Sequence, residues 1–193
     1  MGLHLKTESA KSGKVIFQKV LETARGGFTL DTSGLSDGAT IPAGTPVEFN
    51  ETTRKAKILK TAKVYETASG SPTQIKVEKG HNLAVGNPIG KTVGSAAYAI
   101  TAIDTSNAAY DLVTIGTTIG AVTAGDVLFN SSATGGSAAA LAVSAKGLLY
   151  DDVEVSKDAS LSVVLRGTVY ARRIAVPSAV QTAMPQIIFS NSY

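Results

Sequence analysis

The alternation of apolar and polar residues predicts a chain built mainly from β-strands. Ile75 and Val77 alternate with polar neighbours, and residues 98–103 and 110–115 form two further apolar runs on either side of a turn-like sequence. The strongest signal covers residues 161–174, where apolar side chains dominate one face. This pattern is typical of a sheet with one buried side.

One short helix is predicted near the end of the chain, between residues 175 and 184. Pro177 suits a first helical turn, and Pro185 cannot continue a helix. Residues 187–189 are apolar and predict a last strand. The predicted fold class is therefore mainly β, with little helix.

A turn-and-strand pattern occurs three times, in residues 41–50, 83–89 and 122–130. Each copy has an apolar residue, a small residue, a glycine and then the start of a strand. Glycine tolerates the positive φ that such a turn can require, and a following proline or β-branched residue favours extended backbone. Repeated units of this kind predict a β-scaffold and bring no catalytic groups together.

The strand signals divide the chain into three parts. Residues 1–40 show little periodicity and are predicted to be an N-terminal arm that is disordered or ordered by a neighbouring molecule, for example by adding a strand to its sheet. Residues 41–63 and 133–193 are predicted to form one discontinuous β domain. Residues 64–132 form an insert that we expect to be a small, barrel-like all-β module.

The composition predicts a surface that is covered by partners. Charged residues make up only 17% of the chain and hydrophobic residues 44%, which is a low charge density for a soluble monomer. The net charge is only +3 and tryptophan is absent, so neither a basic patch nor an aromatic platform indicates nucleic-acid binding. Neither a secretory signal nor an apolar run long enough to span a membrane is visible, and we expect synthesis in a cytoplasm.

Candidate chemistry is sparse. Residues 86–92 resemble a phosphate-binding loop, but the spacing between its glycines is one residue too short. His4 and His81 are too few and too far apart in sequence for a metal site, and His81 is expected to have a turn or capping role. Asp151 and Asp152 either bind a cation or a basic arm, or are surface carboxylates at a turn. The prediction is a protein without cofactor or metal that is not an enzyme.

Four short motifs, taken in order, resemble those of tailed-phage head-decoration and head-fiber proteins. The first strand motif is residues 41–47, and residues 145–153 and 163–170 follow after the insert. Residues 185–189 match the closing segment of these families. The insert is similar to small β-modules that are common in phage structural proteins.

The resemblance implies an auxiliary capsid protein, made in a bacterial cytoplasm, that stands on the outer surface of the virion as a homotrimer. Its partners would be the major capsid protein, further copies of itself and other head-fiber proteins, with no nucleic acid and no membrane. The implied capsid-anchoring residues are apolar positions of the arm: Leu3, Leu5, Val15, Ile16, Phe17, Val20 and Leu21. The candidate inter-subunit contacts, which a solvated strand face would explain equally well, are Arg166, Tyr170, Arg172 and Arg173.

Two other functions stay open from the sequence. An adhesin-like module would recognise host-surface carbohydrate through the insert, where Tyr65, Tyr98 and Tyr110 are the candidate aromatic contacts. A hydrolase would need a convergent acid–base site, which the few titratable residues barely permit.

Overall fold

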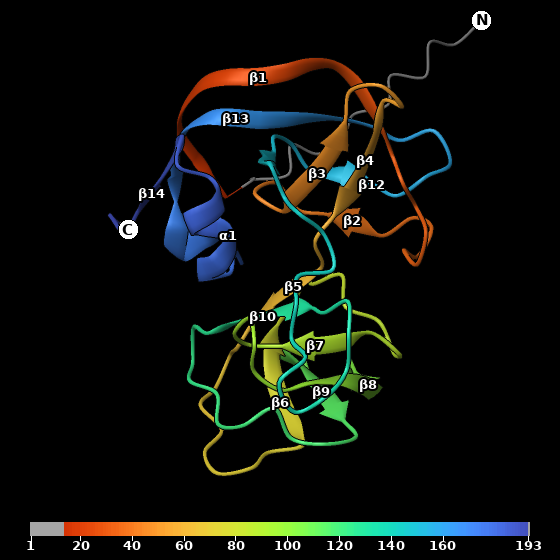
Figure 1. Cartoon of the computed structure of the whole chain (residues 1–193), viewed down its shortest axis with the longest axis vertical. Helices are drawn as coiled ribbons and strands as arrows, with labels where there is room; N and C mark the ends of the chain where they lie inside the picture. The colour runs from red at the N-terminus through yellow and green to blue at the C-terminus, as the bar shows by residue number, and fades with distance from the viewer. Residues whose placement is uncertain (1–13, 193) are drawn as a thin grey trace, which may run out of the picture.

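The structure is a computed structural model that describes residues 14–192, and these form two small β-barrels stacked along the long axis of the molecule (Figure 1). The predicted mainly β fold, with an inserted barrel-like module and one short C-terminal helix, is confirmed. We call the two parts the terminal barrel and the inserted barrel.

The terminal barrel is built from both ends of the described chain. Its strands pair in the order β1, β4, β3, β11 and β13, and β13 pairs again with β1 to close the barrel. Their bounds are Phe17–Leu30 for β1, Lys55–Ile58 for β4, Pro46–Asn50 for β3, Gly147–Leu149 for β11 and Ser160–Tyr170 for β13. Strand β14 (Ile187–Ser190) continues this sheet beside β13, and β2 (Thr40–Ile41) pairs with β12 (Val153–Glu154).

The inserted barrel contains the remaining strands, in the order β5, β10, β7, β8, β9 and β6. A bridge between Val64 and Val77 joins the two ends of this sheet. The bounds are Thr61–Lys63 for β5, Val127–Asn130 for β10, Pro88–Gly90 for β7, Ala97–Asp104 for β8, Tyr110–Ile115 for β9 and Gln74–Glu78 for β6.

The three sequence repeats form the same local structure. Gly44, Gly86 and Gly125 have φ of 82°, 88° and 91°, as at the third residue of a type II turn. Each glycine N–H donates to a carbonyl of a neighbouring segment at 2.8 Å, those of Leu149, Ile100 and Val64 respectively. The strands β3, β7 and β10 start two residues after these glycines. The repeat is therefore a unit that begins a strand and ties its start to the adjacent chain.

The two barrels share a hydrophobic core at their junction. Leu59, Ala97 and Phe129 come from the linker and the inserted barrel, and they pack in one cluster with Leu148 and Val169 of the terminal barrel. The helix α1 (Ser178–Ala183) and the 3-10 helix η1 (Ala171–Arg173) lie on the side of the terminal barrel. This continuous packing holds the inserted barrel in a defined orientation.

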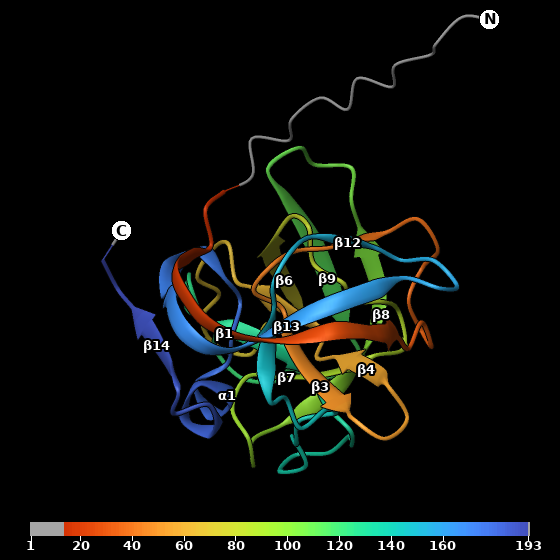
Figure 2. The same cartoon turned by 90° about the horizontal axis from the view of Figure 1, so that it is seen from above.

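The predicted N-terminal arm is the region where the structure differs most from the sequence-based prediction. Residues 17–30, which the sequence placed in an arm without its own structure, form the long strand β1 (Figure 2). This strand pairs with β13 of the same chain from Phe17–Val169 to Thr29–Ser160. The sequence alone did not predict this pairing, because β13 lies far from β1 in the chain and because Gly26 and Gly27 interrupt the apolar pattern of β1.

Three observed boundaries also differ from the predicted ones. β5 begins the inserted barrel at Thr61, before the predicted limit at residue 64. After the predicted end of the insert at residue 132, Gly135 and Leu141 still bridge to residues of the inserted barrel. The predicted strand over 161–174 ends at Tyr170, because η1 follows it.

Candidate interaction surface along the first strand

Strand β1 has an outer edge whose first part is not covered by a strand of residues 14–192. It pairs with β13 on one side, whereas its contact with β4 on the other side is limited to Thr29 and Leu30. Within residues 14–192, no strand pairs with the outer side of 17–22. Unpaired N–H and C=O groups of an edge strand are a template for pairing with another chain. The β1–β13 ribbon runs across the end of the molecule that is remote from the inserted barrel (Figure 1).

Apolar side chains are exposed on the outer face of β13, between β1 on one side and β14 on the other. Leu21 on β1 is 58% exposed and Ile188 on β14 is 63% exposed, and both line one shallow groove together with Arg166. A second groove lies between Leu21 and the exposed Tyr150, with Glu22 and Asp151 on its walls. We call β1 residues 17–22, Tyr150–Asp152 and Ile188 the edge-strand surface.

The structure brings several of the predicted capsid-anchoring residues to this surface. Leu3 and Leu5 lie outside the described residues. Val15 and Leu21 are exposed, and Val20 is half-buried. Ile16 and Phe17 are also half-buried, because they pack against the core cluster at the barrel junction.

The predicted inter-subunit residues make contacts within their own chain. Arg166 lies opposite Glu22 in the β1–β13 ladder. Arg172 and Arg173 are in η1 and not on the strand where the sequence placed them. The Arg173 guanidinium lies 4.4 Å from the Tyr170 ring centroid, and its Nη1 donates to the Val15 carbonyl at 2.7 Å. Arg173 thus fastens the segment that leads into β1.

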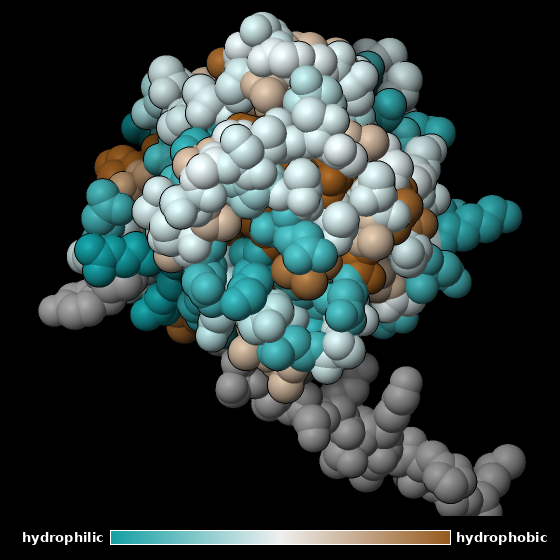
Figure 3. Space-filling model, turned by 90° about the horizontal axis from the view of Figure 1, so that it is seen from below, coloured by the Kyte–Doolittle hydropathy of each residue, from teal (hydrophilic) through white to brown (hydrophobic). Residues whose placement is uncertain are grey.

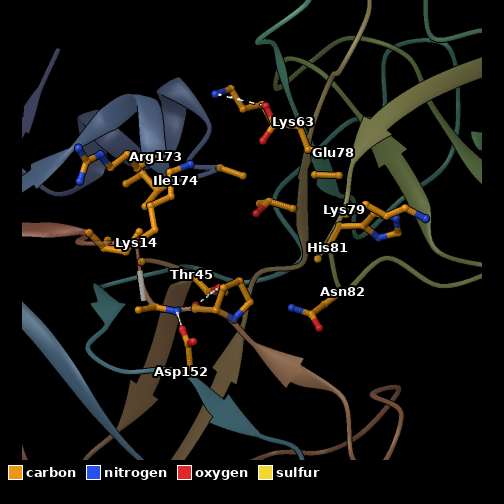
Figure 4. A pocket seen from close by; sticks show the side chains of 18 residues that line it. Lys14, Thr45, Lys63, Glu78, Lys79, His81, Asn82, Asp152, Arg173 and Ile174 are labelled. Carbon is orange, nitrogen blue, oxygen red and sulfur yellow. Dashed lines mark hydrogen bonds and ion pairs between the residues drawn. The ribbon is translucent and has the colours of Figure 1, made fainter. Parts of the chain in front are cut away.

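A cavity of about 310 Å³, which no sequence motif predicted, lies between the two barrels. Figure 4 shows Lys14 and Arg173 of the terminal part on one side and Lys63, Glu78 and His81 on the other. Lys63 crosses the junction, because its Nζ donates to the Arg172 carbonyl at 2.9 Å and lies 3.6 Å from Glu78 Oε1. The cations at this cavity are largely engaged with groups of the chain itself.

A buried polar cluster adjoins the cavity on the side of the inserted barrel. His81 Nδ1 accepts a hydrogen bond from the Leu83 N–H at 3.2 Å, which confirms the turn role expected for this residue. The other ring nitrogen, Nε2, lies 3.3 Å from Asp111 Oδ2, and Asp111 is also paired with Lys79. Burial lowers the pKa of His81, with Asp111 acting in the opposite direction.

Other candidate chemistry has structural explanations. The segment 86–92 is a turn followed by β7, with no helix start of the kind a phosphate-binding loop requires. Asp152 Oδ1 accepts the Ala43 N–H at 2.8 Å and thereby holds the first repeat turn. Among residues 14–192, no three His, Asp or Glu side chains are grouped so that they could hold a metal ion.

Two of the three tyrosines considered for carbohydrate binding lie together on the inserted barrel. The rings of Tyr65 and Tyr110 are 5.6 Å apart, and Lys76 lies 4.9 Å from the Tyr110 centroid. Tyr98 instead packs against the core of this barrel. Figure 3 shows the molecule from the side of the inserted barrel. Residues of intermediate hydropathy cover most of this face, and apolar residues appear in small separate spots.

Comparisons with known proteins identify no relative. No family model matches the chain, and searches of curated proteins and of solved structures find no significant match. In the described part of the chain, no helix has the length and apolar character needed to cross a membrane.

Proposed function

We propose that this protein is an auxiliary capsid protein, a head-decoration or head-fiber protein that binds the outside of a tailed-phage head. The observation that carries the proposal is the outer edge of β1 over residues 17–22, which no strand of residues 14–192 covers, together with Leu21 and Ile188, which are exposed on either side of β13. A strand of another chain can add to such an edge through backbone hydrogen bonds, and its neighbouring segments can place apolar side chains in the grooves over β13.

The rest of the molecule suits this role. The two barrels share a hydrophobic core, and the β1–β13 ribbon crosses the end of the molecule opposite the inserted barrel (Figure 1). The low charge content of the chain favours weak contacts, and the symmetry of a phage head would repeat each of them many times. A homotrimer would match the local three-fold symmetry of such a head.

The test uses full-length protein and purified heads of the phage that encodes it. Leu21→Lys is compared with Val85→Lys, which changes another exposed apolar residue, 60% exposed, on the inserted barrel. We expect wild type and Val85→Lys to sediment with the heads and Leu21→Lys to lose at least about tenfold in affinity. Light scattering across a dilution series gives the oligomeric state, for which we expect a trimer. Failure of wild type to bind the heads, or equal binding of the two variants, would overturn the proposal.

Carbohydrate binding is the second candidate function, and the Tyr65–Tyr110 pair is the observation that favours it. Tyr65 is 46% exposed, and Glu66 and Lys76 beside it offer an acceptor and a donor 2.8 Å apart. Aromatic rings flanked by polar groups can stack on sugar rings. Binding of wild type but not Tyr65→Ala on an array of bacterial surface glycans would support this function, and absence of binding by wild type would exclude those glycans.

A further inference from the structure

We infer that protonation of His81 loosens the contact between the two barrels, through the loop from His81 to Asn87 and the Lys60 side chain that this loop helps to hold. The inference is independent of the proposed function. It depends on two contacts within the loop, His81–Leu83 and Ala84–Asn87, and on the Lys60 side chain, which joins this loop to the terminal part.

The contact between the barrels depends in part on Lys60 in the linker between β4 and β5. Its side chain donates to the Gly34 carbonyl of the terminal part and to Asn87 Oδ1 of the inserted barrel, at 3.3 Å for the second bond. Lys60 is only 7% exposed, and neither acceptor is a carboxylate. Burial lowers the pKa of this ammonium. A buried cation held by two neutral acceptors is sensitive to the loss of either.

Asn87 is held in place by its own turn. The Ala84 N–H donates to Asn87 Oδ1 at 3.0 Å, and the Asn87 N–H donates to the Ala84 carbonyl at 3.0 Å. The Asn87 carbonyl also accepts the Ile100 N–H of β8 at 3.0 Å, so Ala84 controls the orientation of the Asn87 side chain, the group that Lys60 contacts, more than its backbone. Ala84 comes directly after Leu83, which packs in the core of the inserted barrel and donates its N–H to His81.

The geometry of His81 requires a neutral ring. A backbone N–H can only donate, so Nδ1, which accepts from Leu83, carries no proton. The side chain of His81 is 6% exposed. A proton added at Nδ1 would place two donors opposite each other and remove the bond to Leu83. The charged ring would also favour water, which the adjacent cavity of about 310 Å³ can supply.

The charged groups around the ring act in both directions. Asp111 on β9 favours the protonated form of the His81 ring, whereas Lys79, in the loop after β6 that also contains His81, opposes it. Lys79 is held by Asp111 and by the Thr105 carbonyl at 2.9 Å, and Asp104 at the end of β8 also interacts with it electrostatically. With its carboxylate already paired to Lys79, Asp111 compensates only part of the cost of burying a second cation.

The test measures the distance between the barrels as a function of pH. Because the chain has no cysteine, Ser36→Cys on the terminal part and Thr117→Cys on the inserted barrel, both exposed, accept spin labels without competition. Double electron–electron resonance would be recorded from about pH 7.5 to about pH 5, above the range in which most carboxylates titrate. We expect a second distance population to grow by up to about tenfold per pH unit as one proton is taken up.

The control is His81→Asn in the same labelled chain. An asparagine oxygen can accept the N–H two residues further on, as His81 does, but it does not titrate in this range. We expect no pH-dependent second population in this variant. Should it fail to fold, Asn87→Ala supplies the second comparison: it should show the second population already at neutral pH. A distance distribution in wild type that is independent of pH, or one that changes equally in His81→Asn, would overturn the inference.

Discussion

A Cβ atom on Gly44 would lie 2.4 Å from Cγ2 of Ile174, well inside van der Waals contact. The same atom would lie 3.0 Å from Cγ2 of Ile16. The first repeat turn is therefore a packing point, where the segment before β1 and the segment after η1 meet. The third copy of the turn has no such neighbour, because nothing lies within 4 Å of a Cβ built on Gly125.

The two glycines provide a matched pair of alanine substitutions. Both have positive φ, so alanine costs about 1–2 kcal/mol of backbone strain at either site. Gly44→Ala must also displace Ile174, which adds about 1–3 kcal/mol. We expect chemical denaturation to show the larger loss of unfolding free energy for Gly44→Ala. Equal losses would mean that Ile174 moves aside without cost.

Lys60→Met tests the buried ammonium between the barrels. Methionine fills a similar volume but leaves the Gly34 carbonyl without this donor and Asn87 Oδ1 with only the Ala84 N–H, at a cost of about 1–3 kcal/mol. Lys57→Met is the control, because Lys57 is exposed and lies 3.5 Å from Asp31 in a surface pair worth at most about 1 kcal/mol. An unfolding free energy for Lys60→Met equal to that of Lys57→Met would contradict the role assigned to Lys60.

The unfolding free energy should decrease on mild acidification because of His81. Its pKa in the folded protein is lowered from the ordinary value of 6.5, first of all by burial. Between the folded value and 6.5 the unfolded chain binds more protons, so stability rises with pH in this window. The contribution is complete above about pH 6.5 and is lost as the pH falls toward the folded pKa. In His81→Asn, urea unfolding at a series of pH values should show a weaker dependence.

Arg173→Ala should expose the bond after Lys14 to trypsin. The guanidinium donates to the Val15 carbonyl and stacks on Tyr170, so its removal frees the segment that leads into β1. We expect the product that begins at Val15 to form roughly threefold to tenfold faster, with the fold retained. Arg172→Ala is the matched control, because this neighbouring side chain is exposed. Mass spectrometry of timed digests distinguishes the two variants.

Local features of the sequence predicted a large part of this fold. The alternating segments became β6, β8, β9 and β13, and the three repeats became turns with positive-φ glycines. These predictions succeed because turn geometry and side-chain alternation depend on residues that are close together in the chain. The short helix before Pro185 was predictable for the same reason.

Tertiary structure decided the features that involve distant residues. β1 is a strand because β13 supplies its hydrogen bonds, and its free edge exists because β4 reaches only its last residues. Lys60, His81 and Asp111 carry no distinctive motif, and their burial follows from packing around the junction and the inserted barrel. The sequence by itself thus determined the local units and the mainly β class. Which edges stay open, and which charges are buried, depended on contacts between segments far apart in the chain.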